Sequence, residues 1–236
     1  MSDRVLVIAP HPDDEVLGCG GFMHRLAGEG ASVQVVVMSG GKPGLYADEA
    51  VQNVRQEARS AHGFLGAGET VFLDFFAPEL DLYSVSELAG SIAKLIREFK
   101  PLRMFIPHRG DIHHDHRAVY NAALVAARPV QGCSVKEIYA YETLSETAWA
   151  PPFADDAFIP TCFVDISEHI EQKIEALRCF RSQLREYPSS RSVEAVRALA
   201  LFRGVTVGLF WFSVNWRIQS FELAYKNGGI HHAQTT

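Results

Sequence analysis

The stretch Val5-Leu6-Val7-Ile8-Ala9-Pro10-His11-Pro12-Asp13-Asp14-Glu15 determines the fold of this chain and points to its chemistry. Its first five residues are a continuous apolar run rich in β-branched side chains, which is typical of a strand buried on both faces of a sheet. Polar residues follow at once, where the strand gives way to a helix. Ligands of open α/β sheets bind in the crevice beyond the carboxyl ends of the strands, so this junction is a candidate site.

Short β-branched runs alternate with longer segments of helical period along the rest of the chain. We expect further strands at 33–38, 71–73 and 104–106, and helices at 48–65, 84–99, 117–127, 167–180 and 192–202. This alternation predicts an α/β fold with a mostly parallel sheet and helices on both of its faces. The Ala-Pro-Pro-Phe sequence at 150–153 is expected in a surface loop, and the aromatic run 209–216 alternates like a strand with one buried face.

Length and composition favour a single globular domain. The chain has 236 residues, of which 47% are hydrophobic, enough to bury one large core. We expect this domain to cover residues 1–227 and to be followed by a flexible tail at 228–236. The 28 acidic and 22 basic residues give a net charge of −6, which would repel phosphate backbones and disfavours a general nucleic-acid binder.

The sequence also favours a cytoplasmic protein. Its beginning lacks the pattern of a signal peptide, and its apolar runs fall short of the roughly 20 residues that span a bilayer. The four cysteines form no C-x-x-C motif and are expected to be reduced. We therefore expect a small-molecule partner and no transmembrane segment, while the number of copies in an assembly stays open.

A second polar cluster, His108-Arg109-Gly110-Asp111-Ile112-His113-His114-Asp115-His116, follows the expected strand 104–106. If both strands are parallel, both clusters lie at the same rim of the sheet. His11 and Asp14 from one turn and His116 from the other supply two imidazoles and a carboxylate. Three such ligands with a fourth position left for water are typical of catalytic zinc. We expect Zn²⁺, although two histidines and one carboxylate also suit non-haem iron(II).

The remaining groups of the two clusters suit acid–base chemistry. Asp13 could accept a proton from a metal-bound water, and His113 could donate a hydrogen bond or proton to an oxyanion, with Asp115 holding that imidazole protonated. Such a set fits hydrolysis of an amide. Aspartates before a helix are often simple N-caps, but two clusters at two strand ends favour chemistry. Three further residues fit a solvated loop equally well: His108, Asp111 and His114.

These motifs resemble those of the zinc-dependent de-N-acetylases of the PIG-L or LmbE-like family. Pro10 to Glu15 is similar to the (A/P)-H-P-D-D-E signature of that family, and His113 to His116 is similar to its H-x-D-H signature. The resemblance implies a Rossmann-like fold. It also implies zinc held by His11, Asp14 and His116, with Asp13 as the base and His113 as the acid that stabilises the oxyanion.

The resemblance extends to about residue 183. Arg55-Gln56-Glu57-Ala58 is similar to the R-x-E-A helix of the family, which places an arginine near the substrate sugar. This implies that Arg55 binds substrate, although a helix-surface charge explains the residue equally well. The C-terminal aromatic run departs from the family, and its interpretation as core or as a subunit contact is simpler than as a substrate platform.

We therefore predict a metal-dependent hydrolase that removes an N-acetyl or other N-acyl group from an amino-sugar substrate, which could be a glycoside or nucleotide-linked. One alternative is a non-haem iron(II) oxygenase that uses the same two histidines and one aspartate. Another is a metal- or sugar-binding protein without turnover, although metal binding alone would not require Asp13 and His113. The glycines form neither G-x-G-x-x-G nor a P-loop, so no nucleotide cofactor is implied.

Overall fold

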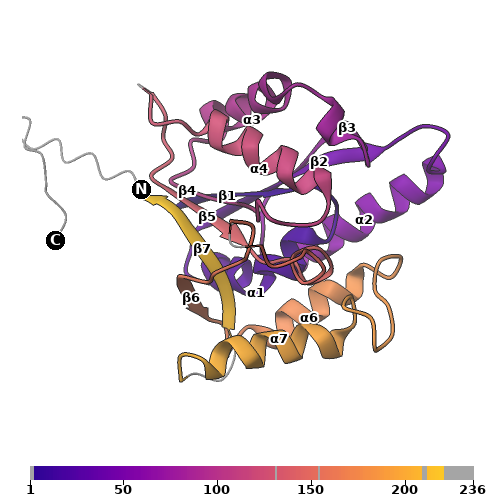
Figure 1. Cartoon of the computed structure of the whole chain (residues 1–236), viewed down its shortest axis with the longest axis vertical. Coiled ribbons are helices and arrows are strands. Elements are labelled where there is room, and N and C mark those ends of the chain that lie inside the picture. Colours follow the sequence, from indigo (N-terminus) through magenta and orange to yellow (C-terminus); the bar gives the residue numbers. More distant parts are fainter. Residues whose placement is uncertain (1–2, 131, 154, 209–211, 221–236) are drawn as a thin grey trace, which may run out of the picture.

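The described residues form a seven-stranded sheet with the strand order β3-β2-β1-β4-β5-β7-β6 (Figure 1). The structure is a computed structural model that describes residues 3–130, 132–153, 155–208 and 212–220. Its strands are β1 (Arg4–Ala9), β2 (Ser32–Gly41), β3 (Thr70–Ala77), β4 (Arg103–Pro107), β5 (Glu137–Tyr141), β6 (Cys162–Asp165) and β7 (Phe212–Ser220). The first five are parallel, whereas β7 runs antiparallel to both of its neighbours.

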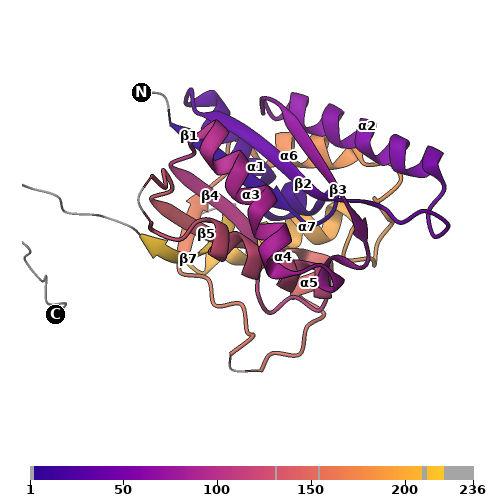
Figure 2. The ribbon, with the colours of Figure 1, turned by 90° about the horizontal axis from the view of Figure 1, so that it is seen from above.

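Helices cover both faces of the sheet because its central strands are apolar on both sides. In β1, Val5, Val7 and Ala9 belong to one core, and Leu6 and Ile8 belong to the other. The first core is closed by α1 (Asp14–Gly28), α2 (Asp48–Phe64), α6 (Ile170–Cys179) and α7 (Val193–Val205), and the second by α3 (Val85–Phe99) and α4 (His114–Ala126). Seen from above, α3 and α4 lie in front of the sheet and α6 and α7 behind it (Figure 2).

The topology confirms the predicted Rossmann-like α/β fold. The parallel strands have the order β3-β2-β1-β4-β5, and the direction of winding reverses between β1 and β4. At such a reversal the loops after the two strands diverge to opposite faces and leave a crevice at the carboxyl ends. The two polar clusters follow β1 and β4, so both lie at this crevice.

The structure differs from the sequence-based expectation at several element boundaries. Helix α4 begins at His114, three residues before the predicted start, because the Nδ1 atom of the preceding His113 accepts the backbone N–H of Asp115 at 3.1 Å and caps the helix. Helix α6 begins after the predicted Ser167, whose N–H and hydroxyl both bond to Asp165 in a turn. The short strands β5 and β6 and the short helices η1 (Leu80–Leu82) and α5 (Leu144–Thr147) were not predicted.

The C-terminal predictions can be compared only in part. Strand β7 overlaps the alternating run predicted at 209–216, while residues 209–211 and the predicted flexible tail at 228–236 lie outside the described residues. Residues 151–153 are exposed, as expected for a surface loop. Among the described residues, no helix combines the length and the apolar character that crossing a membrane requires.

Helix α1 bends at Cys19, whose backbone is not helical. Side chains from two neighbouring elements, α6 and β5, contact the helix beside this bend. The ammonium of Lys173 in α6 donates to the carbonyl oxygens of Leu17 at 2.7 Å and Gly18 at 3.4 Å. The buried ring of Tyr141 packs directly on Gly18 and donates its hydroxyl to the carbonyl of Ile8 at 2.9 Å. The helix that begins at Asp14 is thus fixed against both β1 and β5.

We expect Gly18→Ala to destabilise the protein by about 1–3 kcal/mol, because an added Cβ would lie 2.3 Å from the Tyr141 ring. Gly28→Ala in the same helix is the matched control, since its Cβ would meet nothing within 4 Å. That control should be neutral or stabilise by up to about 1 kcal/mol. Urea unfolding of both variants measures the difference, and equal midpoints would contradict this account of the packing.

Candidate metal centre and active site

His11, Asp14 and His116 converge at the carboxyl ends of β1 and β4. Asp14 is the first residue of α1 and is completely buried, and its Oδ2 atom lies 3.2 Å from Nδ1 of His11 and 3.1 Å from Nε2 of His116. His116 is on the first turn of α4 and is also completely buried. The three residues predicted as metal ligands are therefore brought together, each with one ligand atom within 4.8 Å of the others.

One nitrogen of each candidate ligand imidazole lies within hydrogen-bond distance of a buried carboxylate. Nδ1 of His116 lies 2.7 Å from Oδ2 of Asp111, whose other oxygen accepts the hydroxyl of Thr147 at 2.6 Å. Nε2 of His11 lies 2.9 Å from Oδ2 of Asp115. Such carboxylate–histidine pairs fix the ring and its tautomer so that the other nitrogen can bind a metal. They leave Nε2 of His116 and Nδ1 of His11 turned toward Asp14.

This arrangement fits a divalent cation. Among the described residues, the buried Oδ1 atom of Asp14 has no hydrogen-bond partner, and Nε2 of His116 faces the Oδ2 atom of Asp14 at 3.1 Å. Burial opposes charge on all three side chains, but the His116 and His11 rings hold the pKa of Asp14 well below its usual range. Likewise, Asp14 and Asp111 outweigh burial and raise the pKa of His116. The electrostatic potential between these three side chains therefore favours positive charge. Their two nitrogens and one oxygen match the ligands preferred by zinc.

Asp13 lies beside the candidate metal centre in an unusual backbone conformation. Its φ is 112°, in the region that favours glycine, and its carbonyl accepts the N–H groups of Val16 and Leu17 at the start of α1. Its own N–H donates to Glu15 at 3.3 Å. Burial raises the pKa of Asp13 well above its usual range, and Arg191, with Nη1 at 3.2 Å from Oδ2, offsets only part of this effect.

Two buried residues that sequence reasoning left without a role support this turn. Glu15 Oε1 lies 2.7 Å from Nε2 of His62 in α2, and Nδ1 of His62 lies 2.8 Å from the hydroxyl of Thr70 in β3. The other oxygen of Glu15 is the one that holds the Asp13 N–H. The strained turn is therefore connected to α2 and β3. His62 carries no local signal of this contact, because it is 47 positions from Glu15.

His113 lies next to the imidazoles of the two candidate ligands, with its ring centroid 4.6 Å from that of His11. Its Nδ1 atom accepts the N–H of Asp115, so the neutral ring carries its hydrogen on Nε2, a tautomer assigned from the hydrogen bonds. Burial and the neighbouring His11 lower the pKa of His113. A neutral ring that carries its hydrogen on Nε2 is thereby favoured.

The structure corrects the expected partner of Asp115. The sequence predicted that its carboxylate would hold the His113 ring protonated. One carboxylate oxygen instead lies 2.9 Å from His11 Nε2, and the other accepts the backbone N–H of Leu80 at 2.9 Å. Asp115 raises the pKa of His113, but burial and His11 lower it more. The residue that it orients directly is His11.

A cavity of about 330 Å³ opens onto these groups. Asp13, His11, His113 and Arg55 of α2 are among the residues that line it. Arg55 forms an ion pair with Asp74 and packs over the Phe72 ring at 4.9 Å. Its place in the cavity lining is compatible with the predicted contact with substrate. The loop between α6 and α7 adds further lining residues that sequence reasoning missed: Ser182, Gln183 and Arg191.

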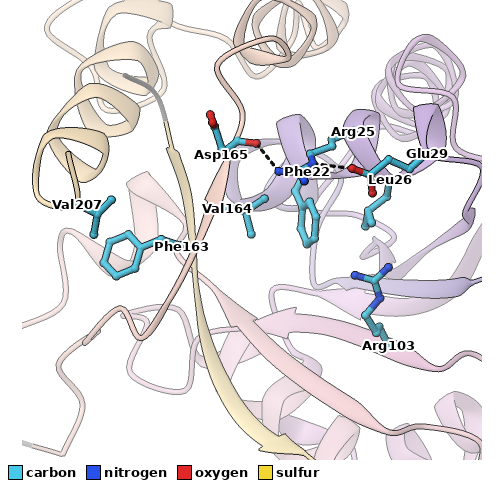
Figure 3. Close-up of a pocket in the computed structure, with 9 residues that line it drawn as sticks. All are labelled: Phe22, Arg25, Leu26, Glu29, Arg103, Phe163, Val164, Asp165 and Val207. Carbon is cyan, nitrogen blue, oxygen red and sulfur yellow. Dashed lines mark hydrogen bonds and ion pairs between the residues drawn. The ribbon is translucent and has the colours of Figure 1, made fainter. Parts of the chain in front are cut away.

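A second hollow, of about 500 Å³, lies at the opposite end of the sheet between α1 and β6 (Figure 3). Its arginines are already paired. Arg25 donates to Glu29 at 2.8 Å and to the carbonyl of Asp165 at 3.0 Å, and Arg103 bonds to Asp3. The candidate metal-ligand groups found in the described part of the chain all contain His11 and lie elsewhere. The smaller cavity, which His11 lines, is therefore the candidate active site.

Comparisons with known proteins found a matching family model and similar proteins. The family model described as PIG-L, GlcNAc-PI de-N-acetylase, matches residues 6–127, which include both polar clusters. An uncharacterized deacetylase of Escherichia coli, YaiS, is 31% identical over 184 residues, 75% of this chain and 90% of the relative. A diacetylchitobiose deacetylase of Thermococcus kodakarensis is 28% identical, over 87% of this chain and 79% of the relative.

A solved structure supports the fold. The N,N'-diacetylchitobiose deacetylase of Pyrococcus horikoshii superposes with a TM-score of 0.74 at 24% sequence identity. The match covers 92% of this chain and 84% of that protein. The shared architecture includes the sheet whose central strands carry the site.

Proposed function

Because the chain belongs to the PIG-L, or GlcNAc-PI de-N-acetylase, family, we propose that it is a metal-dependent hydrolase that removes an N-acetyl group from an amino-sugar substrate. The observation that carries this proposal is the convergence of His11, Asp14, His116 and Asp13 beside one cavity. The match to GlcNAc-PI de-N-acetylases and the relative that is a diacetylchitobiose deacetylase support the N-acetyl sugar as substrate class.

His11, Asp14 and His116 would hold the metal, and zinc suits this donor set best. A zinc ion bound there would supply a Lewis acid that polarises the amide carbonyl and makes a water molecule more acidic. Asp111 and Asp115 would keep the two imidazoles in the tautomers that bind it, through their contacts of 2.7 and 2.9 Å.

The residues beside the metal site would handle the proton and the developing charge. Asp13 would take the proton from the attacking water at Oδ1, a buried atom with no hydrogen-bond partner among the described residues. It would pass that proton to the amide nitrogen as the C–N bond breaks, so that acetic acid and the free amine of the sugar leave. His113 would donate its Nε2 hydrogen to the carbonyl oxygen as negative charge develops there. Arg55, on the cavity wall, would bind a hydroxyl of the sugar.

Mass spectrometry of a panel of N-acetylhexosamine compounds, free, glycosidic and nucleotide-linked, tests the proposed reaction. We expect zinc-loaded protein to remove one acetyl group from at least one compound, and His116→Ala to remove none. If every compound survives while zinc is shown to be bound, deacetylation of common hexosamines is wrong. Metal analysis together with oxygen uptake separates hydrolysis from the iron(II) oxygenase alternative, since only the oxygenase consumes oxygen.

A further inference from the structure

The two carboxylate oxygens of Asp13 have different surroundings. Oδ2 lies 3.2 Å from Nη1 of Arg191, which comes from the loop between α6 and α7. Oδ1 is buried and has no hydrogen-bond partner within the described part of the chain. Asp13 and Arg191 both line the cavity. The contact with Arg191 therefore distinguishes one oxygen of Asp13 from the other.

The guanidinium of Arg191 is held on several sides. Its Nε donates to the Ser145 hydroxyl at 3.1 Å, its Nη1 donates to Gln183 Oε1 at 3.3 Å, and its Nη2 lies 3.6 Å from Glu146 Oε1. These partners come from α5 and from the same loop as Arg191. A planar guanidinium with its donors bound on several edges has little freedom to turn.

The backbone of Arg191 is also fixed. Its N–H donates to the Ser189 hydroxyl at 3.2 Å, and its carbonyl accepts the N–H of Arg185 at 3.1 Å. The next residue, the buried Ser192, caps α7 by accepting the N–H of Ala195 at 3.1 Å. The loop itself is tied to α2, because Ser182 bonds to Glu57 through its N–H and its hydroxyl. Arg191 thus contacts Asp13 from a loop whose backbone is held in place by these hydrogen bonds.

We infer that Arg191 is a positioning residue that fixes the side-chain rotamer of Asp13, holding Oδ2 so that Oδ1 is presented to the reacting water. The assignment of a reacting water rests on the proposed function, whereas the fixed rotamer rests on the contacts alone. Arg191 also contacts two carboxylates with different nitrogens, because its Nη1 lies 3.2 Å from Asp13 Oδ2 and its Nη2 lies 3.6 Å from Glu146 Oε1. Without it, these two negative groups would share one cavity wall with no cation between them.

The shape of the side chain matters as well as its charge. Lysine would keep the charge, but its single ammonium could not contact Ser145, Gln183, Glu146 and Asp13 in the directions that the planar guanidinium reaches. We therefore expect both Arg191→Met and Arg191→Lys to displace Asp13 and lower kcat, with the smaller loss of kcat in the lysine variant. A role in overall charge alone would instead leave the lysine variant unchanged.

Crystal structures of metal-loaded wild type, Arg191→Met and Arg191→Lys test the inference without any need for turnover. We expect the Asp13 carboxylate to leave its wild-type position, or to take two rotamers, in both variants. The control Arg197→Met, which removes an arginine of α7 bound to the exposed Glu171, should leave Asp13 unmoved. An unmoved Asp13 in both Arg191 variants overturns the inference.

Kinetics with a substrate found as described above gives the second readout. We expect kcat of the Arg191 variants to fall about 10²-fold, with KM changed by less than about threefold, because the base is misplaced rather than the substrate site. Added guanidinium ion should restore part of kcat in Arg191→Ala and none in Asp13→Asn. Unchanged kcat would overturn the inference, whereas absence of turnover in wild type would count against the proposed function and leave the crystallographic result standing.

Discussion

Asp13→Asn is expected to lower kcat by about 10²–10⁴-fold while the bound metal is retained. The amide cannot accept the proton that we assign to the carboxylate, and Asp13 is not one of the three converging ligands. Asparagine is also the substitution that spares the backbone, since it tolerates positive φ better than other residues and Asp13 has a φ of 112°. Steady-state kinetics with metal analysis by mass spectrometry measures both parts of the expectation.

The matched control for this variant is Asp81→Asn. Asp81 is partly exposed and lies 3.5 Å from the exposed ring of His114, outside the cavity lining. Its neutralisation should leave kcat and metal content unchanged. Wild-type turnover in Asp13→Asn would refute Asp13 as the base, and loss of the metal would show that Asp13 acts as a ligand instead.

His116→Ala is expected to weaken metal binding by at least about 10²-fold and to abolish turnover. The substitution removes one of the three converging groups and takes the imidazole partner from two buried carboxylates, Asp14 and Asp111. Leaving buried charges without their partners costs about 3 kcal/mol, so the free energy of unfolding should also fall. Calorimetric titration with zinc and urea unfolding measure the two effects.

His114→Ala provides a close control for the metal-site variant. It lies two positions earlier in the same helix turn, but its side chain is 75% exposed, so its loss should change neither zinc affinity nor stability by more than the measurement error. If both histidine variants bind zinc like wild type, the ligand assignment of His116 is wrong. If both variants lose zinc, the loss is caused by disruption of the first turn of α4 and not by removal of the His116 imidazole.

Much of the fold and the convergence of the three candidate ligands could be predicted because the signals are local. Strand β1 contains a continuous apolar run from Val5 to Ala9, and the polar turn begins directly after its last residue. The same relation holds for β4 and the cluster from His108 to His116. Parallel strands with crossover helices then require both turns to lie at one rim, so two local patterns were enough to predict one site.

The parts that escaped prediction depend on contacts between distant segments. Arg191 is separated from Asp13 by 178 positions in the sequence. It lies in a loop whose sequence shows neither helical nor strand periodicity. Asp111 looked like a solvated loop residue, yet it is completely buried against His116. The early start of α4 was missed because its N-cap is a histidine rather than one of the usual short polar residues.

The candidate site follows two adjacent central strands, so the elements that fix the candidate ligands differ from α2, which lines part of the cavity. The positions of His11 and His116 are set by β1, β4 and buried carboxylates, whereas Asn53 and Val54 of α2 line the cavity from outside that framework. Substitutions at Asn53 and Val54 can therefore change the room in the cavity without replacing His11, His116 or the carboxylates that hold them. We therefore expect a library of variants at these two positions to differ in the substrates that they accept while the candidate reaction centre stays the same.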